Sequence, residues 1–208
     1  MVEKRVTPYI TTALGSYLAG SIPFGYLLVR IFRGEDIRQS GSGNIGATNV
    51  SRKSPGLGAL TLLLDVLKGW IPVILACRAF QGAEGYQLGA VAAFSAIVGH
   101  LFPVWLKFRG GKGVATGLGA WLGFAPMSVL VMVAVFAVMV ALFRYISLGS
   151  VTAAAIFPLA ARWRGDDHGL PVVLGCMAAS SLLIILKHRA NLARLMAGTE
   201  NKFRSKSK

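Results

Sequence analysis

The chain has 208 residues, of which 54% are hydrophobic and only 14% are charged. A soluble domain carries about a quarter charged residues, so this composition excludes an ordinary soluble protein and indicates a membrane protein. The net charge is +14, yet the lysines and arginines stand between long uncharged runs and form no continuous basic face, which argues against nucleic acid as a partner.

Apolar runs that are long enough to cross a membrane recur along the chain. A helix rises about 1.5 Å per residue, so about 20 apolar residues cover the hydrocarbon core. The predicted transmembrane segments are 6–29, 54–77, 86–106, 114–124, 126–143, 145–161 and 170–186. We therefore predict an all-α, polytopic membrane helix bundle with about seven transmembrane helices, forming a single integral-membrane domain over residues 1–208. An alternative with five crossings makes 114–143 re-entrant.

The basic residues predict the orientation of these segments. Most of them lie at Arg30, in the loops at 33–53 and 107–112, at Arg144 and in the C-terminal tail. In the seven-crossing and the five-crossing arrangement alike, these places share one side, which the positive-inside rule assigns to the cytoplasm. The N-terminus is then outside and the C-terminus is cytoplasmic.

The first unusual cytoplasmic stretch is "GSGNIGATNV", residues 41–50. Glycines at 41, 43 and 46 allow a positive φ, so that consecutive N–H groups can converge on an anion, and Arg52 adds a full positive charge. The alternative is an ordinary glycine-rich connector. The stretch is not a Walker A loop, because the Gly-Lys pair followed by Ser or Thr is missing.

The second stretch is "FRGGKGVATG", residues 108–117. Two cations, Arg109 and Lys112, stand among three glycines directly before an apolar helix, which is where a helix N-terminus favours an anion. A positive-inside anchor with a flexible turn is the alternative, although an anchor needs no run of glycines.

The third stretch is "KHRANLARLMAGTE", residues 187–200. The spacing places His188, Asn191 and Leu195 on one helical face. A final membrane helix with a basic tail would explain the cations of this stretch, but it explains neither the asparagine nor the ending with Glu200.

Two charges fall inside an apolar segment. Asp65 and Lys68 stand at i and i+3, close enough to pair. Charges inside the membrane suggest function by default, but we favour a charge-neutral pair that locks two helices together. For His100, near the cytoplasmic end of its helix, we favour a packing or supporting role over catalysis.

The three cytoplasmic motifs resemble the bacterial acyl-phosphate:glycerol-3-phosphate acyltransferases, the PlsY family. The resemblance extends to "GSIPFGYLL", "LDVLKG" and "GHLFPVW" in the first three segments and covers nearly the whole chain. It implies transfer of a fatty acyl group from acyl phosphate to the 1-hydroxyl of glycerol 3-phosphate, giving lysophosphatidic acid and phosphate. It further implies no cofactor and no metal, contact with membrane lipid, and an active site on the cytoplasmic side of the bacterial plasma (inner) membrane.

The resemblance also implies roles for particular residues. Those expected around one phosphate, with the last two supporting the loop, are Ser42, Gly43, Asn44, Arg52, Thr48 and Asn49. Those expected at a second phosphate contact are Gly110, Gly111, Lys112 and Gly113, with Thr116 nearby. His188 and Asn191 are expected to face glycerol phosphate, while Arg194 and Glu200 hold the terminal segment. Which phosphate each loop binds stays open.

The mechanism has two alternatives. The His-x4-Asp motif of other glycerol phosphate acyltransferases is absent, and no Ser-His-Asp order is evident. Because acyl phosphate is already activated, we expect positioning and charge neutralisation to do most of the work, with a donor phosphate oxygen accepting the proton. Ser42 and Lys112 would stabilise the developing charge, and His188 as a general base is the competing hypothesis. A transporter, which predicts polar groups near the membrane midplane and often a repeat, is the alternative from another functional class.

Overall fold

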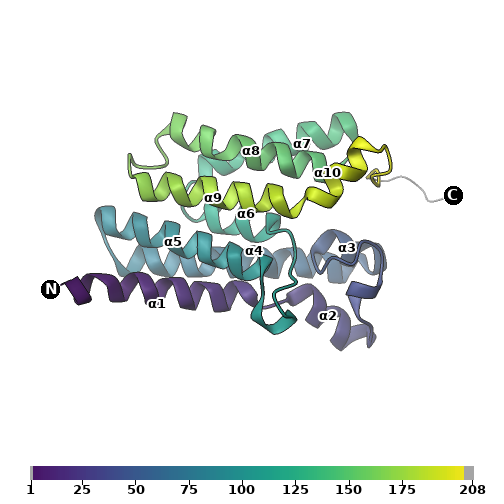
Figure 1. The fold of residues 1–208 in the computed structure, drawn as a ribbon, viewed down its shortest axis with the longest axis horizontal. Coiled ribbons are helices and arrows are strands. Elements are labelled where there is room, and N and C mark those ends of the chain that lie inside the picture. Colours follow the sequence, from purple (N-terminus) through teal and green to yellow (C-terminus); the bar gives the residue numbers. More distant parts are fainter. Residues whose placement is uncertain (1, 204–208) are drawn as a thin grey trace. The chain divides into compact units, whose positions relative to one another are not determined.

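The computed structural model describes residues 2–203, and within that part every regular element is helical (Figure 1). Apolar runs in a membrane form helices because a helix satisfies its own backbone hydrogen bonds. The elements are α1 Val2–Ser21, α2 Phe24–Arg33, the 3-10 turn η1 Ile37–Gln39, α3 Ala47–Lys53, α4 Pro55–Ala79, α5 Gly82–Leu101, the 3-10 turn η2 Val104–Leu106, α6 Val114–Leu122, α7 Pro126–Phe143, α8 Ile146–Arg164, α9 Pro171–Lys187 and α10 Arg189–Met196.

Among the described residues, five helical segments are long and apolar enough to cross a membrane. They are Val6–Arg33, Pro55–Ala79, Gly82–Leu106, Pro126–Phe143 and Ile146–Arg164. A sixth arises if α9 and α10, which are bent by 53° at His188, count as one span. The expected count of seven is not confirmed, because α6 has only 9 residues. At about 1.5 Å per residue, such a helix covers less than half of a hydrocarbon core of about 30 Å.

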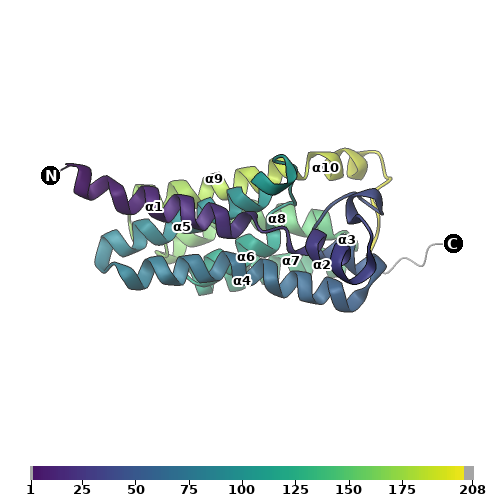
Figure 2. The ribbon, with the colours of Figure 1, turned by 90° about the horizontal axis from the view of Figure 1, so that it is seen from below.

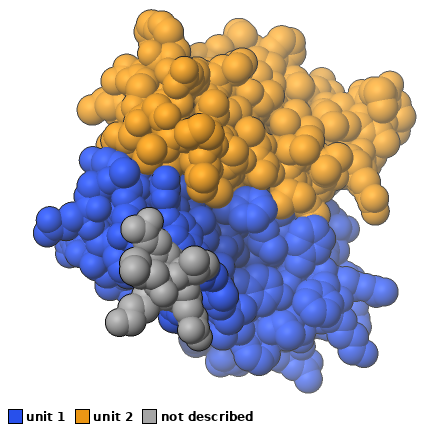
Figure 3. Space-filling view, turned by 60° about the vertical axis from the view of Figure 1, so that its left-hand side comes forward, with its two compact units in different colours: residues 1–124 blue, residues 125–208 orange. Residues whose placement is uncertain are grey.

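The chain divides into two compact units, residues 1–124 and 125–208, which Figure 3 colours separately. Unit 1 contains the two glycine-rich motifs, residues 41–50 and 108–117, and unit 2 contains the third motif, residues 187–200. The prediction of a single domain over residues 1–208 stays a prediction beside this division.

In unit 1, α1, α4 and α5 run side by side (Figures 1 and 2). Small residues let α1 and α5 approach very closely, as in many membrane helix pairs. A methyl group added at Gly20 would overlap the carbonyl of Ala96, and one added at Gly99 would overlap the carbonyl of Tyr17. The two backbones are therefore in direct contact along this seam.

The first predicted segment, residues 6–29, is not one regular helix. It is interrupted between α1 and α2 at Ile22 and Pro23, because proline has no N–H to donate and clashes with the preceding turn. The Phe24 N–H instead donates to the Ile22 carbonyl at 3.1 Å. The chain leaves α1 at this point and continues as α2 toward the first glycine-rich motif.

Unit 2 is built from α7, α8 and α9, with α10 at its end. The Ser128 hydroxyl, in the first turn of α7, donates to Asp166, which follows α8, so these two helices run antiparallel. Gly149 of α8 allows close contact with Phe136 of α7. Only 11% of the residues of α7 are buried, as expected for a helix that faces lipid.

Candidate functional site

The motif at residues 41–50 forms a tight loop before α3. Gly41 and Gly43 have φ values of 57° and 69°, the left-handed region that only glycine adopts without strain, as the sequence predicted. The same expectation is wrong for Gly46, whose φ is −78°. Gly46 is the N-cap of α3, and its N–H donates to the side-chain oxygen of Asn44 at 2.9 Å. Its conformation is therefore open to other residues.

The side chain of Asn49 holds this loop together. Asn49 is 3% exposed, and its amide nitrogen donates to the carbonyls of Ile37, Ser40 and Asn44 at 3.3, 2.9 and 2.9 Å. Its side-chain oxygen accepts from the Ser42 N–H at 3.0 Å. One buried amide thus fixes the turn from η1 to α3, which agrees with the expected supporting role and leaves no donor of Asn49 directed at a ligand.

Two of the backbone donors expected to bind an anion are used inside the loop. The Ser42 N–H donates to Asn49 and the Gly43 N–H donates to the Ser40 carbonyl at 3.0 Å. Ser42, Thr48 and Arg52 remain exposed. An anion at this loop would therefore be bound by these side chains, and not by the N–H groups of residues 42 and 43 as the sequence suggested.

The second motif turns sharply between α5 and α6. The N–H groups of Gly110 and Gly111 donate to the carbonyls of Leu101 and His100 at 3.2 and 3.1 Å, so the loop folds back onto the end of α5. Gly113, with φ of 82°, then starts α6, and Lys112 lies half-buried just before it. Two non-glycine residues earlier in the loop, Lys107 and Phe108, also have positive φ. Strained backbone of this kind is concentrated at functional sites.

Thr116 does not belong to the surface of this loop. Its side chain is completely buried, and its carbonyl lies where a side chain on Gly69 of α4 would stand. Close packing of α6 on α4 turns Thr116 into the interior of unit 1, and its place near a phosphate stays a prediction.

One hydrophobic cluster brings the two loops of unit 1 together. It consists of Val29, Ile37, Ile45, Val50 and Leu106. Ile45 belongs to the first glycine-rich loop, and Leu106 of η2 stands just before the second. Arg38, Lys107 and Arg109 line an open hollow of about 600 Å³ beside this cluster, together with Tyr26, Trp105 and Leu106. Unit 1 therefore packs the first loop and the segment just before the second on one core cluster, beside a cationic hollow.

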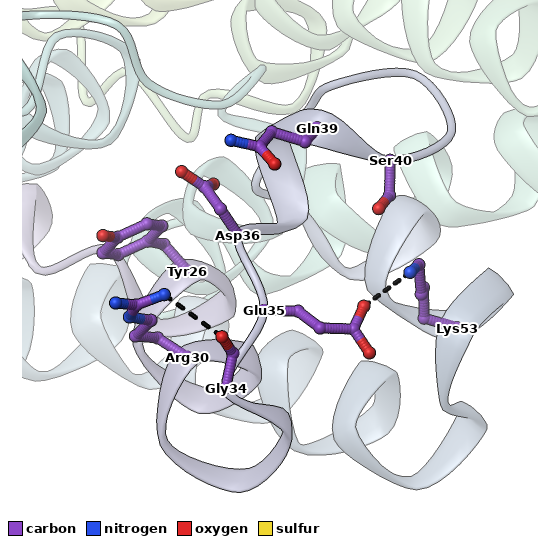
Figure 4. Close-up of a pocket in the computed structure, with 8 residues that line it drawn as sticks. All are labelled: Tyr26, Arg30, Gly34, Glu35, Asp36, Gln39, Ser40 and Lys53. Atoms are coloured by element: carbon purple, nitrogen blue, oxygen red, sulfur yellow. Dashed lines mark hydrogen bonds and ion pairs between the residues drawn. The ribbon is translucent and has the colours of Figure 1, made fainter.

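A neighbouring polar hollow does not coincide with the motifs (Figure 4). Two of its charges are paired within the protein, Lys53 with Glu35 at 2.5 Å and Asp36 with Arg38 at 2.6 Å, and Arg30 donates to the Gly34 carbonyl at 3.1 Å. None of the residues predicted to bind substrate lines either of the two hollows. We therefore place the candidate site at the glycine-rich loops.

In unit 2, His188 stands at the bend between α9 and α10. The imidazole is 2% exposed, and its Nδ1 lies 2.8 Å from the Ile184 carbonyl. A carbonyl only accepts, so Nδ1 carries the hydrogen and, in the neutral ring, Nε2 carries the lone pair. This tautomer is compatible with the binding role and with the general-base role.

Glu200 is the centre of a polar cluster in unit 2. Its carboxylate accepts from Asn191 Nδ2 at 2.6 Å, from the Ser147 hydroxyl at 2.8 Å and from Arg194 Nε at 2.7 Å. Arg194 and Glu200 do anchor the terminal segment, as expected. Burial acts to raise the pKa of Glu200, but the hydrogen bonds from Asn191, Ser147 and Arg194 outweigh it and hold that pKa below its usual value.

The sequence analysis missed two parts of these clusters. Ser147 bonds Glu200 across 53 positions of the chain, and a lone serine in an apolar run carries no signal of such a contact. His100 lies with its Nδ1 3.7 Å from the Asp65 carboxylate. In the sequence, His100 and Asp65 stand out only as polar residues within apolar runs, which does not indicate that they lie close together. Asn191, predicted to face substrate, donates to Glu200 and so links α10 to the terminal segment, while its contact with substrate stays a prediction.

Solved structures with the same fold define the class of protein. The chain matches two crystal structures of an integral-membrane glycerol 3-phosphate acyltransferase, PlsY, in a glycerol 3-phosphate form and a lysophosphatidic acid form. The TM-scores are 0.87 and 0.83 at 36% and 35% identity, and each match covers 94% of this chain and 95% of the other. The fold is therefore that of a multi-pass membrane acyltransferase.

Sequence relatives identify the family. Residues 10–198 match the family described as glycerol-3-phosphate acyltransferase. The protein of that name from Syntrophotalea carbinolica is 46% identical over 96% of this chain and 100% of the relative. The one from Trichlorobacter lovleyi is 48% identical over 92% and 95%. The chain belongs to the PlsY family of glycerol-3-phosphate acyltransferases and is an enzyme of this class.

We expect Asn49→Asp to loosen the first loop. The substitution replaces a group that donates to three carbonyls by an oxygen that repels them, and leaving such groups unsatisfied costs about 1–3 kcal/mol. Thermal unfolding should shift to lower temperature, and amide protection factors over residues 41–46 should fall. Gln39→Glu, the same change at an exposed position, is the control and should leave both unchanged. Wild-type protection in Asn49→Asp would contradict the assigned role.

We expect the anchoring of the terminal segment to depend on pH. Because the pKa of Glu200 is lowered on folding, its stabilising contribution is complete above its ordinary pKa of 4.5 and is lost as pH falls through the lower folded value. Protection factors over residues 197–203 should stay constant from neutral pH down to about 4.5 and decrease below it. Glu200→Gln should lower them at neutral pH, whereas Glu84→Gln, at an exposed position of α5, should not. Constant protection through the acid range would exclude the carboxylate as the anchor.

Proposed function

We propose that this enzyme transfers a fatty acyl group from acyl phosphate to the 1-hydroxyl of glycerol 3-phosphate at the cytoplasmic face of the bacterial inner membrane. The products are lysophosphatidic acid and inorganic phosphate. The observation that carries the proposal is the arrangement of unit 1, where one core cluster supports two glycine-rich loops that bear Arg52 and Lys112. Both substrates carry phosphate, and the names of the relatives supply the acyl acceptor.

The reaction balances without a cofactor. The hydroxyl oxygen attacks the acyl carbon and forms the new ester bond, while the bond from that carbon to the bridging phosphate oxygen breaks and phosphate leaves. A phosphate oxygen of the donor accepts the hydroxyl proton. Lys112 neutralises charge that develops on the leaving phosphate, and the Ser42 hydroxyl donates a hydrogen bond to it. Prepositioned donors of this kind lower the barrier most where charge develops.

His188 as a general base is the second candidate mechanism. The hydrogen on its Nδ1 is fixed by the Ile184 carbonyl, which leaves Nε2 as the basic nitrogen. We favour a binding role for His188, because acyl phosphate already carries a good leaving group and a phosphate oxygen that can accept the proton.

The orientation proposed for the sites follows from charge. The loops of unit 1 that carry the two motifs also carry Arg38, Arg52, Lys107, Arg109 and Lys112. The positive-inside rule places such loops in the cytoplasm. With the seven crossings predicted from the sequence, the N-terminus is outside and the C-terminus inside, next to the cellular pool of soluble phosphate esters.

We expect Lys112→Met to lower turnover of acyl phosphate and glycerol 3-phosphate by about 100-fold or more, because it removes a full positive charge from the leaving phosphate. Turnover is measured as release of phosphate and lysophosphatidate by the purified enzyme. Arg78→Met removes an exposed charge in the last turn of α4, outside both motif loops, and should keep most of the activity. Wild-type turnover with acyl-CoA in place of acyl phosphate would refute the proposed donor.

His188→Gln separates the two mechanisms. A general base contributes about 10²–10⁴-fold to the rate, so its loss would appear in kcat. We expect instead that kcat is largely retained and that KM for glycerol 3-phosphate rises. The measurement is steady-state kinetics with each substrate varied in turn, and a kcat lowered by two orders of magnitude or more would establish the base role.

A further inference from the structure

A buried ion pair in unit 1 has no part in the proposed chemistry. Asp65 and Lys68 lie one turn apart in α4, within a candidate membrane span, and each side chain is only 3% exposed. Lys68 Nζ lies 2.8 Å from Asp65 Oδ1. Charges at such positions are costly to bury, and those that occur are paired and commonly functional. The contacts that the pair makes with its neighbours indicate its role.

Lys68 connects the pair to the first glycine-rich loop. Its ammonium donates to the Ile22 carbonyl at 2.7 Å, at the interruption between α1 and α2, and stands 5.6 Å from the ring centroid of Phe24. Gly25, the next residue of α2, packs so closely on Ile45 that any side chain there would overlap the Ile45 carbonyl. The ammonium thus fixes the start of α2, and α2 in turn supports the loop that contains Ser42.

Asp65 connects the pair to the second glycine-rich loop through His100. The imidazole Nδ1 stands 3.7 Å from Asp65 Oδ1. The other side of the ring lies against Gly111, where an added methyl group would overlap Nε2. The carbonyls of His100 and Leu101 accept the N–H groups of Gly111 and Gly110. The orientation of His100 therefore determines where the chain runs immediately before Lys112.

We propose that Asp65, Lys68 and His100 form one positioning network that sets both phosphate-binding loops from inside the membrane. The network has two arms: Lys68 acts through α2 on residues 41–46, and His100 acts directly on residues 110–113. These are positioning residues, since all three side chains are buried and act on the loops through other residues. The kinetic part of the proposal rests on the proposed function, but the positioning itself does not.

A charge-neutral lock between helices is the alternative, and it makes a different prediction. Replacing a buried ion pair by neutral groups of similar size is often harmless or stabilising. A pair that serves only as a lock could therefore be replaced without effect on the loops. A positioning network loses its specific contacts on the same replacement, even where the fold is as stable as before.

The experiment compares two variants with one control in purified full-length protein. The double variant Asp65→Asn with Lys68→Met removes both charges and keeps the volume. His100→Leu leaves the ion pair intact and removes the second arm alone. Asp167→Asn is the control: its carboxylate is also buried, at 2% exposed, and is paired with Arg162 at 2.9 Å, but it lies after α8 in unit 2. The readouts are thermal unfolding, amide protection factors and steady-state kinetics.

The two arms should respond separately. In His100→Leu, protection over residues 110–113 should fall, because leucine does not reproduce the packing of the imidazole against Gly111, while residues 41–46 stay protected. In the double variant both loops should lose protection by about tenfold while the unfolding temperature changes little. Both variants should show kcat lowered by about tenfold or more, because small displacements of a binding loop have effects of that size. Asp167→Asn should change neither loop.

If both loops keep their wild-type amide protection factors in the double variant, the positioning network is refuted and the ion pair serves only as a charge-neutral lock between helices. Wild-type protection of residues 110–113 in His100→Leu would overturn the second arm, and it decides this arm even if the double variant does not fold. If the wild-type enzyme fails to turn over acyl phosphate, the proposed function fails, whereas the protection factors still test the network.

Discussion

An ammonium and a carboxylate that are buried in an apolar helix have to find partners, and this requirement organises unit 1. Asp65 and Lys68 neutralise each other within α4, and each makes a further polar contact with a neighbouring segment: Lys68 with the carbonyl of Ile22, and Asp65 with His100 of α5. Helix packing by dispersion alone would allow several relative rotations of these helices. The polar contacts select one of them, and with it the positions at which α2 and α5 deliver the two glycine-rich loops.

Much of the architecture could be predicted from the sequence because the membrane imposes a simple rule. Uninterrupted apolar runs form helices, and the segments at 54–77, 126–143 and 145–161 correspond closely to α4, α7 and α8. The rule fails where local chemistry competes with it. Pro23 divides the first run into α1 and α2, and the run after residue 113 yields α6, a helix of only 9 residues, before α7. Hydropathy alone does not distinguish a short buried helix from one that spans.

The candidate site was predictable in its composition but not in its contacts. The glycines and cations of the two loops of unit 1 are visible in the sequence, as is the positive φ of Gly41 and Gly43. Which donors are already used inside the protein is not visible. The side-chain amide of Asn49 donates its hydrogen bonds to carbonyls of its own loop, and that of Asn191 donates one to Glu200. A loop fixed in this way has already lost its conformational entropy before it binds a ligand.

The close seam between α1 and α5 has a consequence for the lipid substrate. Where the backbones of Gly20 and Gly99 meet the facing helix directly, there is no layer of side chains between the two helices that could move aside. A hydrocarbon tail is about as wide as a side chain, so it cannot enter the protein between them. An acyl chain bound at the cationic loops would therefore have to lie along other helices, whose surfaces still carry movable side chains. Two residues that have no side chain thus close this one route into the protein.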